Sequence, residues 1–348
     1  MAYKKKDKII TYRLLSFIIP IFLVGCISME KSTSTVSSLL EEEEVLLQKK
    51  ILIKEMVEST KILHKISWPI LKNNRNICKN TNSFSYGIIF ATSEDLAVKE
   101  FSLFKEIFNH KIEKVYFEKY KTDNFPVIIS VAEDSPAKEA GLKINDIILE
   151  INNKNTKNFR RKLSSAFIKK ESIRIKILRE NKAIIKDIIG IKICNYNVQA
   201  LPSAMPNAYA DGKKVFVTIG AIKLSETTDE LAFLIGHELA HNIFHYKTPG
   251  SNEAFTNSIN YNDKPKIREL KSILVYTNRK REIEADIKGL EIAYKGGFEL
   301  NNVNDYWRRL SVFYPELIDK SSLNYKGNAF RASLISSTLK KIKEKYAR

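Results

Sequence analysis

Apolar residues recur at helical spacing in three separate parts of the chain. The first part covers residues 36–68, where apolar side chains recur three and four positions apart. The second covers residues 228–244 and begins with a capping box, in which Thr227 is followed three positions later by Glu230. The third, residues 329–346, is basic and amphipathic. We therefore expect a long helix in the first part of the chain and packed helices in the last third.

A different pattern fills the middle of the chain. Residues 127–131, 147–151 and 173–178 are short apolar or alternating runs bounded by turn-forming residues, which is typical of β-strands. Gly141 is placed to end a short helix between the first two runs. Further on, the Asp-Gly pair at 211–212 separates two strand-like runs and predicts a hairpin. We therefore expect an α+β fold, in which a β-rich module is inserted between helical regions and the last domain contains a small sheet.

The second predicted helix contains the sequence His-Glu-Leu-Ala-His. Because residues four apart share a helix face, His237 and His241 present their imidazoles to one point, while Glu238 lies about 100° around the axis. Two neutral imidazoles suit Zn²⁺, and an adjacent carboxylate suits proton transfer from water on the metal. The chain has five histidines, of which three lie between residues 237 and 245, and this favours a metal site over ordinary packing. The third, His245, is expected to have a supporting or surface role.

A hydrolytic zinc site needs a third protein ligand and an open position for water. The acidic stretch at residues 281–286 is the best source of that ligand. Glu282 and Asp286 are four apart and share a helix face, whereas Glu284 points elsewhere. Only one of the two glutamates can therefore face the metal. The alternative for this stretch is a solvated charged helix.

The two motifs together resemble those of a known peptidase family. His-Glu-Leu-Ala-His, followed some forty residues later by Glu-Ile-Glu-Ala-Asp, resembles the HExxH and ExxxD pair of gluzincin metallopeptidases of the HtpX and CAAX-prenyl-protease type. Residues 206–220 also resemble the segment that precedes the metal helix in that family, so that the resemblance covers about 196–348. It implies a zincin-like helical domain that binds one Zn²⁺ and cleaves protein or peptide substrates. The implied zinc ligands are His237, His241 and Glu282. The resemblance also implies that Glu238 is the general base and that Asp286 fixes a ligand.

The same resemblance suggests further residues around the cleft. In this family a strand beside the zinc site holds the substrate in extended form, and Asn207 and Ala208 would be its contact residues here. The family often carries a His-Pro pair six residues before a late arginine, whereas this chain has Tyr325 and Lys326 before Arg331. Tyr325 is therefore a candidate hydrogen-bond donor to the transition state. The alternative is a packed or surface tyrosine.

The middle module resembles a second family. Residues 134–152 are similar to the conserved core of bacterial PDZ domains, and the similarity covers about 112–192. Asn145 stands where that family usually has glycine. PDZ domains add an extended peptide to a sheet edge, so the resemblance implies substrate docking or autoregulation. The alternative is a purely structural insert.

The first residues of the chain predict export. A basic region is followed by an apolar run at 14–25, which is shorter than the roughly 20 residues of a membrane span and suits a signal peptide. The run ends in Leu-Val-Gly-Cys, which resembles the bacterial lipobox and implies a lipid anchor at Cys26. Residues 26–38 would form a tether. A periplasm-facing location follows, and Ile27, where an aspartate would mark inner-membrane retention, favours the outer membrane over the inner one. The alternative is a signal anchor with an incidental cysteine.

The remaining two cysteines, Cys78 and Cys194, would lie in an oxidising compartment, which favours a disulfide between them over two separate thiols. The formal net charge of +18 would normally suggest nucleic-acid binding. We reject that function because the lysines are spread along the chain and an exported lipoprotein meets little nucleic acid. An anionic membrane surface is a better partner for this charge.

These features predict a membrane-anchored zinc endopeptidase of the bacterial cell envelope. The resemblance implies that its substrates are misfolded or misassembled envelope proteins, as in protein quality control. The expected organisation is a signal peptide at 1–25, a tether at 26–38, a helical region at 39–111, a PDZ-like domain at 112–192 and a metallopeptidase domain at 193–348. The alternative is a peptide-binding lipoprotein with an inactive or structural zinc site. No pattern in the sequence specifies an oligomeric state.

Overall fold

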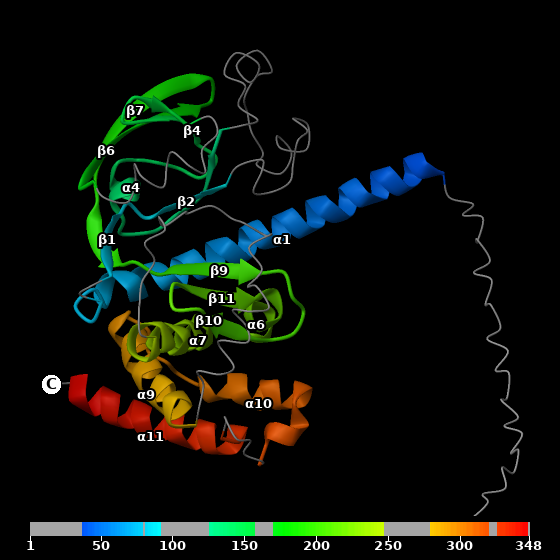
Figure 1. Cartoon of the computed structure of the whole chain (residues 1–348), viewed down its shortest axis with the longest axis vertical. Coiled ribbons are helices and arrows are strands. Elements are labelled where there is room, and N and C mark those ends of the chain that lie inside the picture. Colours follow the sequence, from blue (N-terminus) through cyan, green and yellow to red (C-terminus); the bar gives the residue numbers. More distant parts are fainter. Residues whose placement is uncertain are drawn as a thin grey trace, which may run out of the picture. The chain divides into compact units, whose positions relative to one another are not determined.

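A computed structural model describes residues 37–78, 81–91, 125–156, 170–246, 279–319 and 326–346 (Figure 1). The predicted signal peptide, Cys26, most of the predicted tether and Tyr325 lie outside these residues. Helices and sheets both occur, which confirms the α+β fold. None of the described helices is long and apolar enough to cross a membrane. The described residues from Leu46 onward form one compact unit, to which the contacts below belong.

Helix α1 (Ser38–Asn73) continues past Pro69, near which the sequence predicted its end. Proline lacks the N–H that would continue the hydrogen-bond ladder. However, Ile70 and Leu71, directly after it, are buried, and their burial offsets the lost hydrogen bond. At the helix end, the Ile70 carbonyl accepts both the backbone N–H of Asn74, at 3.2 Å, and the side-chain amide of Asn74, at 2.9 Å.

The middle module is built on an antiparallel sheet with the strand order β2-β3-β4-β6-β7, and β5 pairs with β4. The bounds are β2 Ile88–Ala91, β3 Val127–Val131, β4 Ile147–Ile151, β5 Lys154–Asn155, β6 Ser172–Arg179 and β7 Lys182–Ile189. The short helix α4 (Pro136–Glu139) is capped by the hydroxyl of Ser135, which accepts from the Lys138 N–H. The three strands predicted in this region are therefore confirmed.

Strand β2 corrects the expected organisation. It lies before residue 112, in a region expected to be helical, yet it pairs with β3 in the same sheet. All four of its residues are buried. A short run that is buried on both faces has no apolar-polar alternation, so periodicity could not identify it as a strand.

The two faces of this sheet have different partners. One face, which includes Ile128, belongs to a core confined to the middle module. The opposite face, which includes Ile129, joins the larger core that also contains α1. At this contact, the Nδ1 atom of His64 on α1 lies 2.8 Å from the hydroxyl oxygen of Ser130 on β3. The middle module is thus packed against α1.

The C-terminal domain combines a three-stranded sheet with helices. Its strands are β9 Asn197–Leu201, β10 Ala208–Ala210 and β11 Lys214–Thr218, and its helices are α6 Ile219–Leu224, α7 Thr228–Ala240, η2 His241–His245, α9 Arg279–Lys295, α10 Asn304–Phe313, η3 Pro315–Leu317 and α11 Asn328–Tyr346. Strand β11 is parallel to β9 and antiparallel to β10, so β10 is an edge strand within the described sheet. The predicted hairpin joins β10 to β11. At its turn Gly212 has a φ of +88°, which favours glycine.

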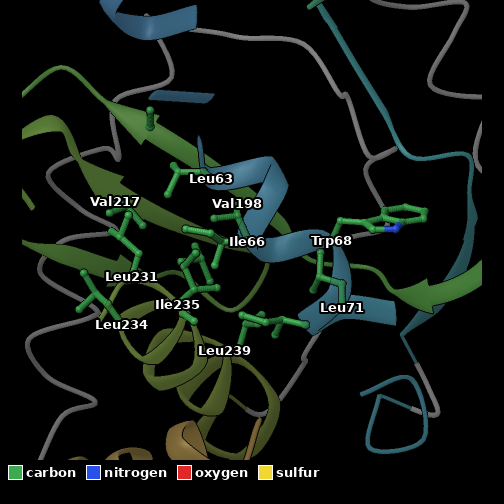
Figure 2. Close-up of a cluster of buried hydrophobic side chains, with 14 of the residues drawn as sticks. Leu63, Ile66, Trp68, Leu71, Val198, Val217, Leu231, Leu234, Ile235 and Leu239 are labelled. Carbon is green, nitrogen blue, oxygen red and sulfur yellow. The ribbon is translucent and has the colours of Figure 1, made fainter. Parts of the chain in front are cut away.

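Helix α1 also packs against the C-terminal domain. Figure 2 shows Leu63 and Ile66 of α1 in one buried cluster with Ile235 and Leu239 of α7 and with Val217 of β11. Burial of each such side chain contributes about 1.5–3 kcal/mol. The apolar face of α7 is therefore packed against α1 and the sheet.

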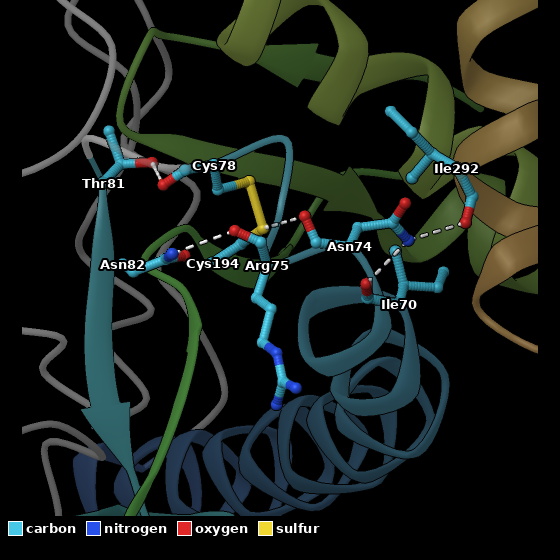
Figure 3. The surroundings of a disulfide bond; sticks show 8 residues. All are labelled: Ile70, Asn74, Arg75, Cys78, Thr81, Asn82, Cys194 and Ile292. Atoms are coloured by element: carbon cyan, nitrogen blue, oxygen red, sulfur yellow. Dashed lines mark hydrogen bonds between the residues drawn. A yellow bond between two sulfur atoms is a disulfide. The ribbon is translucent and has the colours of Figure 1, made fainter.

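The end of α1 is joined covalently to the start of the last domain (Figure 3). The sulfur atoms of Cys78 and Cys194 form a disulfide, with their Cα atoms 5.4 Å apart. Beside it, the amide of Asn74 donates at 2.9 Å to the carbonyl of Ile292 on α9. Strands β1 (Asn82–Ser85) and β8 (Ile191–Cys194) pair next to this bond. The middle module thus leaves and rejoins the chain at one point.

Candidate metal centre and cleft

Helix α7 begins where the sequence predicted. The hydroxyl of Thr227 accepts from the Glu230 N–H at 3.3 Å, and a carboxylate oxygen of Glu230 accepts from the Glu226 N–H at 2.8 Å. Arg309 of α10 pairs with the same buried Glu230 carboxylate at 2.5 Å. These contacts fix the start of α7 and attach α10 to it.

His237, His241 and Glu282 converge at one buried point. The Nε2 atoms of the two imidazoles are 3.1 Å apart, and the carboxylate oxygens of Glu282 lie 3.4 Å and 3.3 Å from them. Tetrahedral zinc with bonds of about 2.0–2.1 Å would separate its ligand atoms by about 3.3 Å. The three donors therefore fit a zinc ion without rearrangement. Each of the three residues is buried.

Two glycines make this convergence possible. A Cβ atom on Gly236 of α7 would lie 2.4 Å from the carbonyl oxygen of Gly289 on α9, and one on Gly289 would lie 2.6 Å from the backbone nitrogen of His237. The backbones of α7 and α9 are therefore in direct contact at their crossing. Because Glu282 and Asp286 lie on α9, this close approach brings both carboxylates to the histidines.

Asp286 lies behind His237. Its Oδ1 atom is 2.9 Å from Nδ1 of His237, although the N–H direction is not well aligned for a hydrogen bond. Its Oδ2 atom accepts from Nε of Arg331 at 2.9 Å, and the Arg331 guanidinium lies 3.8 Å from the centre of the Trp307 ring. Burial would raise the pKa of Asp286, but Arg331 and His237 outweigh it and lower that pKa. Asp286 therefore lies on the side of His237 from which a carboxylate can orient a metal-binding imidazole.

The charges at the site favour a bound cation. Burial lowers the pKa of His237, but the carboxylates of Asp286 and Glu282 outweigh burial and raise it to about 10. Burial raises the pKa of Glu282, but hydrogen bonds from the two histidines outweigh burial and lower it. The cluster is thus rich in negative charge, which either a proton or a metal cation can balance. The pKa of Glu238, in contrast, is raised, chiefly because the side chain is buried.

His245 and Glu284 lie outside this three-donor cluster. In the π-helical turn η2, Nδ1 of His245 is 2.9 Å from Nδ1 of His241. The other ring nitrogen of His245, Nε2, is 3.3 Å from a carboxylate oxygen of Glu284. Glu284 therefore points away from the histidine pair that Glu282 faces.

A cleft of about 520 Å³ opens in front of the metal cluster and Glu238. Its lining includes Asn207 and the strand β10, together with residues of α10, η3 and α11. Its lining is mostly apolar and includes Leu234, Trp307 and Leu310. The cleft can thus accept an extended chain with apolar side chains.

The edge strand β10 has backbone groups that face away from its partner β11. The carbonyl of Asn207 accepts the N–H of Thr218 on β11 at 3.0 Å. Because hydrogen-bonded and non-hydrogen-bonded pairs alternate along an antiparallel ladder, the backbone groups of the next residue, Ala208, point away from β11. The outward N–H of Ala208 is covered by the side-chain oxygen of Asn207 at 2.8 Å. At the other end, the Tyr246 hydroxyl donates to the outward carbonyl of Ala210 at 2.6 Å.

Asn242 attaches the hairpin to the metal helix, a role that the sequence did not indicate. Its amide oxygen accepts from the Gly212 N–H at 2.6 Å, and its amide nitrogen donates to the Lys214 carbonyl at 2.9 Å. Asn242 is fully buried. Its place directly after His241 was the only available signal, because nothing local distinguishes a buried asparagine from a surface one.

Comparisons with known families agree with this arrangement. Residues 176–245 match the model of peptidase family M48, and residues 127–179 match that of a PDZ domain. The M48 match includes both histidines of the cluster. No curated protein matches the chain. The two matches support the recognition that the resemblance suggested, that of an M48-family metallopeptidase with a PDZ domain.

Proposed function

We propose that the protein is a zinc-dependent endopeptidase that hydrolyses peptide bonds in extended protein segments. The observation that carries this proposal is the convergence of His237, His241 and Glu282 beside Glu238 at the base of a cleft. Within the described residues the cluster has three donors, which is typical of a catalytic zinc site, whereas structural zinc sites have four. This difference favours the peptidase over a peptide-binding lipoprotein with a structural zinc site.

The three cluster residues would hold the ion. When bound, zinc supplies a Lewis acid that acidifies water and polarises the scissile carbonyl. Glu238 accepts the proton of the attacking water and passes it to the leaving amine. Burial raises the pKa of Glu238, which makes its carboxylate a stronger base than a solvated glutamate. Asp286, supported by Arg331, holds the imidazole of His237 in place.

The substrate would pair with the outer edge of β10. A peptide can add a strand to an exposed edge through main-chain hydrogen bonds, and the outward groups of Ala208 provide such an edge. Asn207 would release the Ala208 N–H as the peptide enters. The apolar lining favours large apolar side chains near the scissile bond. The PDZ domain would bind peptide segments of the same substrates.

The cellular setting is also a proposal. The apolar run at 14–25 and the lipobox-like sequence ending at Cys26 support a lipid-anchored protein that faces the periplasm. The bond between Cys78 and Cys194 is consistent with an oxidising compartment. Misfolded or misassembled envelope proteins, which expose extended apolar segments, would be suitable substrates for such a cleft.

The test compares the full chain with its Glu238→Gln variant. Both should contain about one zinc per chain by metal analysis, but the variant should cleave casein about 10²–10⁴-fold more slowly, because it lacks the base. Glu299→Gln, a matched change at an exposed glutamate, should leave both measurements unchanged. Cleavage by Glu238→Gln at the wild-type rate would contradict the role of this residue. Zinc binding without any cleavage by the wild type would favour the peptide-binding alternative.

A further inference from the structure

The family motifs do not explain which side chain holds the imidazole of His241, a ligand of the proposed metal site, in place. His237 has a carboxylate behind it, Asp286, at 2.9 Å. Behind His241, on the side away from Glu282, lies the imidazole of His245. The two ring centres are 4.9 Å apart, and the rings meet at 63°. The side chain of His245 is only 6 % exposed, so it is held in place by its surroundings.

The nitrogen atoms that face each other limit the position of the protons. His241 uses Nε2 towards the cluster, because this atom lies 3.1 Å from Nε2 of His237 and 3.3 Å from Glu282. A neutral imidazole that ligates through Nε2 carries its proton on Nδ1. That Nδ1–H points to Nδ1 of His245 at 2.9 Å, and it needs an acceptor there. Nδ1 of His245 must therefore be the bare nitrogen, which places the His245 proton on Nε2.

Glu284 completes the chain of hydrogen bonds. The Nε2–H of His245 faces a carboxylate oxygen of Glu284 at 3.3 Å. An ionised carboxylate only accepts hydrogen bonds, so it selects the Nε2–H form of His245. Glu284 thus fixes the tautomer of His245, and His245 fixes the tautomer of His241. As a result, Nε2 of His241 carries a lone pair that can bind the metal. The opposite tautomer of His245 would set two N–H groups against each other.

We propose that His245 is a positioning residue which, together with Glu284, holds His241 in the tautomer and orientation that bind the metal. This inference rests on the proposed zinc site. His245 itself is outside the three-donor group, and its Nδ1 atom faces Nδ1 of His241, the ring nitrogen that does not point to the cluster. The π-helical turn at His241–His245 carries both rings, which is consistent with the occurrence of such turns at functional sites. The two ligating histidines would then be oriented by different groups: His237 by the carboxylate of Asp286, and His241 by the imidazole of His245.

The first test changes the acceptor at residue 245 in the full chain. His245→Phe keeps a planar ring but removes the acceptor, and it should weaken zinc binding about 10–100-fold in competition with a chromophoric chelator. His245→Asn keeps an oxygen near the position of Nδ1 and should restore most of the affinity. A residue with a purely structural role would not show this rescue. Zinc affinity of His245→Phe within about threefold of wild type would overturn the inference.

The second test requires no variant. In zinc-loaded wild-type protein, nitrogen–proton correlation spectra of the histidine rings should show His241 protonated on Nδ1 and His245 protonated on Nε2. Protonation of His245 on Nδ1 would overturn the inference even if His245→Phe fails to fold. A wild-type protein that binds no zinc would overturn the proposed function and this inference with it. Normal zinc binding with the wrong tautomer would overturn this inference alone.

Discussion

Two histidines, His64 and His237, are equally buried but differ in their polar neighbours and in their pKa values. They are 6 % and 5 % exposed, respectively. Burial lowers the pKa of His64 to about 4, and the polar group beside its Nδ1 atom is the neutral hydroxyl of Ser130. Next to His237 stand the carboxylates of Asp286 and Glu282, and they raise its pKa to about 10. The comparison shows that burial alone makes a neutral structural histidine, whereas burial among carboxylates makes a site for a cation.

The comparison predicts opposite results for two alanine variants, and these are the largest expected effects. His237→Ala should lose its zinc, because two donors do not hold the ion. His64→Ala should keep its zinc but lose about 1–3 kcal/mol of unfolding free energy, because the buried hydroxyl of Ser130 loses its partner. Metal analysis and denaturant unfolding of both variants test this. Zinc loss from His64→Ala would contradict the separation of the two roles.

The positions of the carboxylates around His237 depend on the close crossing of α7 and α9. A methyl group added at that crossing should therefore move the carboxylates away from His237. Gly289→Ala should cost about 1–3 kcal/mol of stability by overpacking. It should also weaken zinc binding, because Glu282 moves away with α9. Gly297→Ala is the matched control: its φ of +95° is unfavourable for alanine, but no atom lies within 4 Å of the new methyl group. That variant should cost about 1 kcal/mol and leave zinc binding intact.

The last prediction concerns pH. Because the folded pKa of His64 is below its unfolded value of about 6.5, its contribution to stability is complete above pH 6.5 and is lost as pH falls towards 4. The loss should reach about 3 kcal/mol over this range. His64→Asn removes the titrating group, so its unfolding free energy should fall less over the same range. Equal pH dependence of the two proteins would show that His64 does not titrate as described.

The parts of the site that were predictable are those encoded by local spacing. Histidines four apart on a helix share a face whatever surrounds them, and Thr227 caps that helix through a neighbour three residues on. The same logic placed Glu282 and Asp286 together and turned Glu284 away. Here the family resemblance and the spacing pointed to the same residues.

The remaining features depend on contacts between distant residues. Gly236 and Gly289 matter only because their helices cross at that point, and no pattern within either helix shows it. Likewise, Asn242 is buried only because the hairpin of β10 and β11 folds over it. Strand β2 became recognisable only by its pairing with β3. Tertiary contacts of this kind leave no periodic signal in the sequence.

The bond between Cys78 and Cys194 also changes what a cut in the middle of the chain would do. The two cysteines are 116 residues apart, and the whole sheet from β2 to β7 lies between them. A single cleavage anywhere in that interval, by this protein or another protease, would leave two fragments that stay linked. Such a nicked protein would keep the helix α1 attached to the metal-binding domain and would migrate as one species until its disulfide is reduced.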